Sequence, residues 1–178
     1  MLSKFVSPVL APVSRMLAVG FIGVNAGLWL SPELAEFPAR AYSGIADADY
    51  NLLLNNRLLG LLISSLQLAV LAYGLFAVAK IFSRLNAGKW YVPEFSGLLR
   101  KFGLSLVVFT LLIPLVQVLM SLALTYNNEV GKRLIVIDMD ASTAPISFVL
   151  LLIGVLLSLM ATVLLRAGEM AEEYEKIV

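Results

Sequence analysis

The sequence predicts an all-α membrane protein with four transmembrane helices and both termini in the cytoplasm, an N-in/C-in arrangement. The chain is 60% hydrophobic and 14% charged, with a mean hydropathy of +0.92. This composition is too apolar for a globular protein whose surface is exposed to water. It also contains runs that approach the ~20 apolar residues a helix needs to cross a bilayer. Its basic residues gather on the side that would hold both termini.

The four spans are expected at about residues 15–31, 58–79, 102–125 and 145–165. The last three contain no Asp, Glu, Lys or Arg. The first is shorter, because Pro12 is expected to break the helix over 9–14 and Arg15 to reach toward the interface. A cleaved signal peptide is the rival interpretation of that first run, but GLWLSPELAEF offers no small-x-small cleavage site after the apolar core.

The charges that flank the spans set the expected orientation. Nine of the 13 basic residues lie on the side of the termini and of the 80–101 hairpin, and the other four lie opposite. By the positive-inside rule, both termini and the hairpin are cytoplasmic. The nine are Lys4, Arg15, Lys80, Arg84, Lys89, Arg100, Lys101, Arg166 and Lys176, and the four are Arg40, Arg57, Lys132 and Arg133.

The outer segment 32–57 is too polar to lie in lipid and is expected to form a short interfacial helix and a turn. The second outer segment, 126–144, contains a β-branched run that predicts a small extracytoplasmic strand. Such a strand needs a partner for its backbone, either residues 40–50 or another copy of the chain. Asp138 and Asp140 are too few ligands for a confident cation site, so we expect no metal and no cofactor.

The hairpin 80–101 is expected to hold a short amphipathic helix that leads into the third span. Pro93 suits a first helical turn, Glu94 complements the helix dipole, and apolar residues repeat at helical spacing from Phe95. Anchoring to anionic lipid headgroups and docking of a cytoplasmic protein are both open, with anchoring preferred. The candidate residues are Arg84, Lys89, Trp90, Tyr91, Arg100 and Lys101.

The cytoplasmic tail, 166–178, continues the last helix and is acidic. Glu169, Glu172 and Glu173 could contact the basic hairpin or simply form a solvated helix end.

Polar residues inside the spans form a candidate cluster of Asn25, Gln67 and Gln117. Gln67 and Gln117 lie at similar depth, so we expect their amides to bond to each other, with Asn25 able to join them. Such a bond would hold helices together, and a small polar pocket beside Pro114 is the alternative.

Small residues recur every four positions in three spans, at Gly23–Gly27, Gly60–Ser64 and Gly154–Ser158–Thr162. This spacing lets helix backbones approach closely. Packing within the chain is the preferred interpretation, and homodimerisation is the alternative.

The sequence lacks the residues on which several functional classes usually depend. The chain has no His and no Cys, and a formal net charge of +1 gives no indication of a nucleic-acid partner. No charged residue stands in the middle of a span, which argues against a proton-coupled transporter. Neither a nucleophile–base pair nor a phosphate loop is recognisable, so we expect a non-enzyme.

Two segments resemble a known family. LFAVAKIFSRLNAGKWYVPEFSGLLRKFG and the C-terminal IDMDASTAPISFVLLLIGVLLSLMATVLLRAGEMAEEYEKIV are similar to the bacterial membrane proteins catalogued as domain of unknown function 2975. The resemblance spans about residues 55–178 and departs from the family at KWYVPEF. It implies four spans and a place in the bacterial cytoplasmic (inner) membrane, and it supplies no active-site residues.

Three functions are therefore expected in order of preference. The first is a non-catalytic inner-membrane protein that binds or regulates another protein, as a sensor, accessory subunit or immunity protein does. The second is a small oligomeric transporter or channel with a path lined by Asn25, Gln67 and Gln117. The third is a membrane enzyme that acts on lipid. Expected partners are anionic membrane lipid and a protein of unknown identity, with further copies of the chain as the alternative.

Overall fold

The computed structural model describes residues 3–45, 52–87, 92–128, 135–136 and 144–177. Helices make up most of this part of the chain: α1 (Ser3–Leu30), α2 (Glu36–Ser43), α3 (Leu54–Asn86), α4 (Val92–Thr125) and α5 (Ala144–Ile177). Of these, α1, α3, α4 and α5 are long and apolar enough to cross a membrane. The predicted all-α class with four candidate spans is confirmed.

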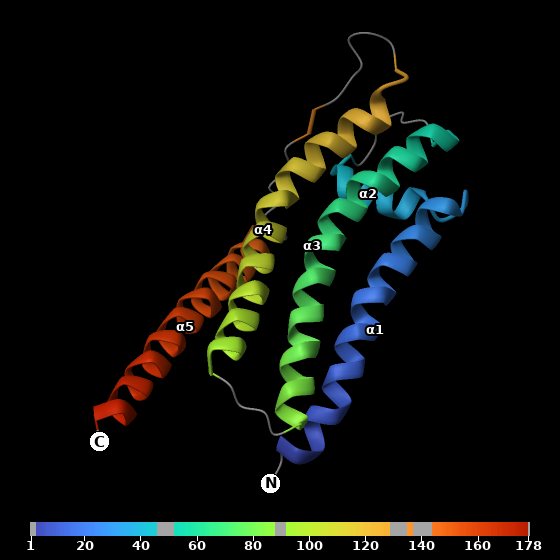
Figure 1. Cartoon of the computed structure of the whole chain (residues 1–178). Helices are drawn as coiled ribbons and strands as arrows, with labels where there is room; N and C mark the ends of the chain where they lie inside the picture. Colours follow the sequence, from blue (N-terminus) through green and yellow to red (C-terminus); the bar gives the residue numbers. More distant parts are fainter. Residues whose placement is uncertain (1–2, 46–51, 88–91, 129–134, 137–143, 178) are drawn as a thin grey trace.

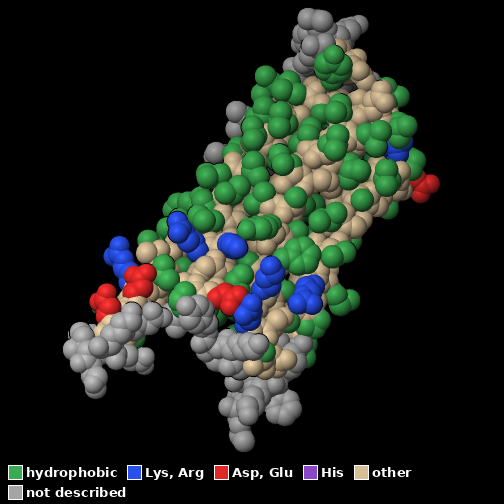
Figure 2. Space-filling model, in the orientation of Figure 1, with side chains coloured by type: hydrophobic (Ala, Val, Ile, Leu, Met, Phe, Trp, Pro, Cys, Tyr) green, Lys and Arg blue, Asp and Glu red, His purple; other side chains and the backbone are tan. Residues whose placement is uncertain are grey.

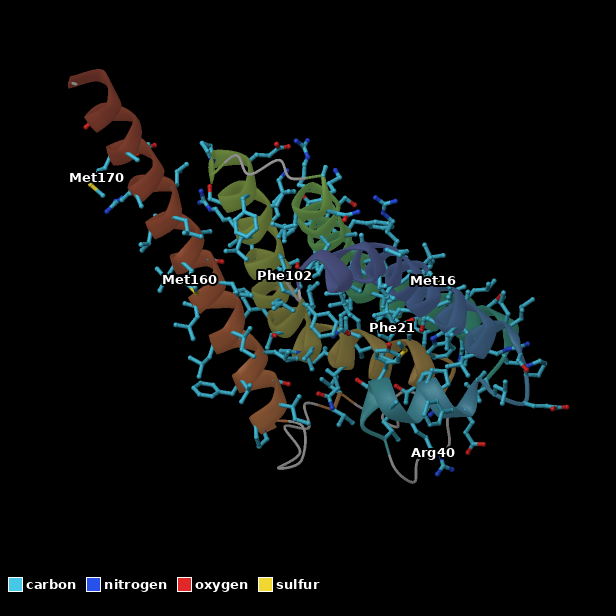
Figure 3. All side chains as sticks on the ribbon, turned by 90° about the horizontal axis from the view of Figure 1, so that it is seen from below. Met16, Phe21, Arg40, Phe102, Met160 and Met170 are labelled. Carbon is cyan, nitrogen blue, oxygen red and sulfur yellow. The ribbon has the colours of Figure 1, made fainter. Side chains whose placement is uncertain are left out.

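The long helices stand side by side in the order α1, α3, α4, α5 (Figure 1). The extensive contacts join α1 to α3, α3 to α4, and α4 to α5, while α2 packs mainly on α4. Viewed from below, α1 and α5 lie at the two edges of this row, and Arg40 of α2 points away from it (Figure 3). The bundle is therefore open, and each edge helix has one long helix as its main neighbour.

The start of α1 and the end of α5 lie at the same end of the row, and α2 lies at the other (Figure 1). We call these the terminal end and the α2 end. On the face shown in Figure 2, Lys and Arg side chains gather toward the terminal end, and hydrophobic side chains cover most of the remainder. An even number of long helices gives this arrangement, because each crossing reverses the direction of the chain.

Helix boundaries differ from the expected ones in two places. The expected break at Pro12 is wrong, because α1 runs without interruption from Ser3 to Leu30. The proline ring fixes φ near the helical value and removes one amide donor, a loss that membrane helices tolerate. The amphipathic segment after Pro93 is not a separate short helix, since it forms the first turns of α4. The acidic tail continues α5 to Ile177, as predicted.

The interfacial helix expected within 32–57 is α2. Its inner face places Ala35, its N-cap residue, and Ala39 against Trp29 of α1 and Met120 and Leu124 of α4. Its outer face carries an ion pair of 2.6 Å between Glu36 and Arg40, one helical turn apart. The helix ends at Gly44, whose φ of 66° is accessible to glycine at little cost, and whose N–H donates to the Arg40 carbonyl at 3.2 Å. Together these contacts cover the α2 end of the row.

Most of the expected strand lies outside the described residues, since 129–134 and 137–143 belong to the part that is left undescribed. Ile135 and Val136 are described and are not in a strand, and the Val136 N–H donates to the Ser121 hydroxyl at 3.3 Å. No strand occurs elsewhere in the described ranges.

Candidate functional site

Glycines bring three pairs of helices into close contact. A methyl group at Gly60 of α3 would lie 2.7 Å from Cζ2 of Trp29 on α1, and one at Gly103 of α4 would lie 2.7 Å from the Gly154 carbonyl oxygen on α5. A methyl group at Gly74 of α3 would collide with the Ser105 hydroxyl of α4. The small-residue stripes that begin at Gly60 and Gly154 therefore pack helices within the chain.

The glycines of α1 behave differently. A methyl group built on Gly20, Gly23 or Gly27 would meet no described atom within 4 Å, and all three residues are exposed. Packing within the described chain is therefore the wrong interpretation of the Gly23–Gly27 stripe. Glycine costs a helix about 1 kcal/mol relative to alanine. The contacts inside the molecule therefore give no reason for glycine at these three outward-facing positions.

The position of these glycines on the helix is well defined. Gly20, Gly23 and Gly27 recur at spacings of three and four, so they form one face, which we call the α1 glycine face. At about 100° per residue, this face lies about half a turn from the residues that α1 buries toward the rest of the molecule. Those buried residues include Ala18 and Asn25. The α1 glycine face therefore looks away from α3, at the open edge of the row.

The expected polar cluster is only partly assembled. Asn25 is buried and donates through Nδ2 to the hydroxyl of Ser64 on α3 at 3.0 Å, with a longer contact of 3.4 Å to Ser65. Ser64 in turn donates to the Gly60 carbonyl at 2.8 Å. Asn25 therefore joins α1 to α3 through hydroxyl groups, a pairing that the sequence analysis missed. The four-residue spacing of Gly60 and Ser64 was the available signal for a close approach there.

The two glutamines are placed by different helices and are not bonded to each other. Gln67 of α3 is buried and Gln117 of α4 is half-buried, and no hydrogen bond between their amides occurs in the described structure. The expected Gln67–Gln117 bond is therefore not formed.

A second polar contact, also missed from the sequence, joins α3 to the end of α4. The amide oxygen of Asn56 accepts from Asn127 at 3.1 Å, and its Nδ2 lies 3.5 Å from the Leu124 carbonyl oxygen. Beside it, Arg57 donates to the Leu30 carbonyl at 3.3 Å, at the C-terminus of α1. The sequence predicts that both residues belong to the first outer segment, which is too polar to lie in lipid. In the structure they lie in the first turn of α3.

A basic pocket of about 440 Å³ opens at the terminal end, between the last turns of α3 and the first turns of α4. Arg84 and Glu94 form an ion pair of 2.6 Å across it, and both side chains are partly exposed. Arg15 of α1 donates to the hydroxyl of Ser83 at 3.3 Å. The pocket is lined by Lys80, Ser83, Arg84, Glu94, Gly97, Leu98 and Lys101.

Among the hairpin candidates, the structure brings Arg84 and Lys101 together in this pocket, and Arg100 is exposed outside its lining. Lys89, Trp90 and Tyr91 lie outside the described residues.

The acidic tail candidates lie on the last turns of α5, where Glu169 and Glu173 are exposed and the side chain of Glu172 is not described. The ion pairs found between described side chains do not include Glu169 or Glu173. A contact between tail and hairpin therefore stays a prediction.

Metal ligands are not gathered anywhere in the described part of the chain, which holds no group of three or more acidic residues arranged for an ion. Asp138 and Asp140 lie outside that part.

A scan against models of known protein families, a search of curated proteins and a search of solved structures each found no match to this chain. The resemblance to domain of unknown function 2975 therefore remains an expectation from the two segments that carry it.

Proposed function

We propose that the chain is a non-catalytic, multi-pass protein of the bacterial inner membrane that binds or regulates another membrane protein through the α1 glycine face. The observation that supports this proposal most strongly is the contrast among the glycines. Gly60, Gly74, Gly103 and Gly154 each allow a close contact inside the molecule, whereas Gly20, Gly23 and Gly27 face open space on an edge helix. In a membrane, helices associate by close backbone approach at such small residues.

The proposed threading places the terminal end in the cytoplasm. Arg15, Arg84 and Arg166 belong to helix segments at the terminal end, with Lys80, Arg100 and Lys101 on the same side, while Arg40 and Arg57 lie at the α2 end. The positive-inside rule supports this orientation. A reporter active only in the cytoplasm should work near Gly88 or after Val178, and one active only outside should work near Gly44 and Gly131. A cytoplasmic signal at Gly131 would reverse the threading.

The oligomeric channel is less well supported as a function. Asn25 and Gln67 are 4% and 5% exposed, so both are enclosed within one copy of the chain and neither faces a path between copies. The Thr110 and Ser158 hydroxyls donate to carbonyls of their own helices. The enzyme that acts on lipid would depend on acidic residues that include Asp138 and Asp140, and no described contact favours it.

A pair of variants tests the proposed function. Gly23→Leu with Gly27→Leu fills the α1 glycine face, and Val155→Phe with Val163→Phe adds as many carbon atoms to the exposed surface of α5. Native gel electrophoresis of membranes solubilised in mild detergent should show a complex heavier than one chain. The glycine variant should shift it to the mass of the single chain, and the valine variant should leave it intact.

The composition of that complex separates the remaining alternatives. Mass spectrometry that finds a different membrane protein in it supports the proposal, whereas further copies of this chain alone support the oligomeric alternative. A complex that persists in the glycine variant would contradict the proposal.

A further inference from the structure

An apolar groove of about 420 Å³ continues from the basic pocket along the line where α3 meets α4. Lys101 lines both the groove and the pocket, so the two cavities meet at this side chain. Each has a volume within the ~300–1,000 Å³ range of small-molecule sites. The groove is lined by Leu66, Ala69, Val70, Tyr73, Lys101, Leu104, Ser105 and Val108.

Helical spacing shows that the two cavities lie along one face of the helix pair. On α4, Gly97, Lys101, Leu104 and Val108 follow at intervals of four, three and four residues, which keeps them on a single stripe. On α3, the lining of the groove runs from Leu66 to Tyr73, about 10.5 Å at 1.5 Å per residue, and the lining of the pocket continues from Lys80 to Arg84. One leaflet of hydrocarbon is about 15 Å thick. The groove is therefore long enough for about two-thirds of an extended acyl chain, the part nearest the headgroup.

Charge at the pocket favours an anion. Three cations, Lys80, Arg84 and Lys101, face one carboxylate, Glu94, so the pocket carries a formal excess of two positive charges. Glu94 is paired with Arg84, and no ion pair to Lys80 or Lys101 occurs among the described side chains. The pocket is open beside Gly97, where an added methyl group would meet no described atom within 4 Å.

We propose that this continuous cavity binds one anionic phospholipid, with its phosphate between Lys80 and Lys101 and an acyl chain along Tyr73 and Leu104. The basic pocket ends where the apolar groove begins, which matches the order of headgroup and chain in a phospholipid at a membrane interface. A zwitterionic lipid would leave the excess charge of the pocket unneutralised. The inference depends on the membrane-spanning helices and needs no protein partner, so it stands or falls separately from the proposed function.

Native mass spectrometry of the purified full chain tests the site, with phosphatidylglycerol and phosphatidylcholine of identical acyl chains as the two probes. We expect one phosphatidylglycerol to stay bound to each chain, and phosphatidylcholine to bind more weakly. Replacing Lys80→Gln and Lys101→Gln together should weaken phosphatidylglycerol binding about thirtyfold, at ~1 kcal/mol for each charge. Replacing Arg100→Gln and Arg166→Gln removes the same charge from exposed positions outside the lining, and should have little effect.

A third variant distinguishes a lipid from a free phosphate. Ala69→Trp fills the groove without changing the pocket, and Leu62→Trp places the same side chain at an exposed position outside the lining. If a lipid is the ligand, Ala69→Trp should reduce phosphatidylglycerol binding, Leu62→Trp should not, and added glycerol phosphate should compete poorly.

Three results would overturn the proposal. Equal binding of the two lipids would remove the role of the pocket, and equal effects of the lysine and arginine variants would show only general attraction to the surface. Efficient competition by glycerol phosphate, with Ala69→Trp unchanged, would make the site one for a soluble anion. Lys80→Arg with Lys101→Arg should restore binding, which excludes misfolding as the cause of a loss.

Discussion

The side-chain amide of Asn25 on α1 donates a hydrogen bond to the hydroxyl of Ser64 on α3, with 3.0 Å between Nδ2 and Oγ. Both side chains are buried. In a bilayer, where neither group can turn to water, this bond fixes the rotation of α1 against α3. It therefore also determines that the α1 glycine face points outward.

This bond can be measured by a double-mutant cycle. Asn25→Leu and Ser64→Ala should each lower the free energy of unfolding by ~0.6 to 2 kcal/mol, because each removes the hydrogen bond between the two helices. The double variant should lose much less than the sum. Ser65→Ala, which removes the longer contact of 3.4 Å, serves as the control and should cost less. Additive losses in a detergent-unfolding series would show that the two residues are uncoupled.

Two alanine substitutions distinguish a glycine that packs inside the chain from one that faces outward. Gly60→Ala forces a methyl group against the Trp29 ring and should lower the free energy of unfolding by ~1 to 3 kcal/mol. Gly23→Ala meets no described atom and should leave the isolated chain unchanged or up to ~1 kcal/mol more stable, from helix propensity. Thermal unfolding of the purified variants measures both. Similar losses from the two would mean that the α1 glycine face is packed within the chain.

A pH dependence follows from Tyr42 on α2. Burial raises the pKa of its phenol above the usual value near 10, because the charged phenolate is disfavoured there. The unfolded chain then loses this proton at a lower pH than the folded chain, so the stability contribution is complete below pH ~10 and declines as the pH rises above it. Tyr42→Phe should show a smaller decline. Identical alkaline unfolding curves for the two proteins would rule out this contribution.

The sequence predicts the spans well, because a long apolar run has few alternatives once the bilayer is the solvent. It also predicts α2 and the helical tail. Pro12 was misjudged, since the rule that proline breaks helices comes from interiors where water competes for the backbone, and a membrane helix keeps its remaining bonds. The apolar spacing that begins at Phe95 also predicts that the first turns of α4 are helical.

The polar contacts were harder to predict for a geometrical reason. Equal distances from the membrane surface place Gln67 and Gln117 at similar height, but they say nothing of the direction in which each side chain points around its helix. The structure pairs Asn25 with Ser64 instead. In the same way, the spacing of Gly23 and Gly27 indicates a close approach without naming the approaching surface. The groove between α3 and α4 could not be predicted from the sequence, because it depends on how the two helices are positioned against each other.

The central claim, that the α1 glycine face binds another membrane protein, is tested most directly by a photo-reactive amino acid introduced at single positions along α1 in living cells. Gly20, Gly23 and Gly27 should each give a cross-link to the same protein, because they share one face of the helix. Phe21 and Ile22 are also exposed but lie roughly a third of a turn from that face, and they should give none. Cross-linking at all five positions alike, or at none, would contradict the claim.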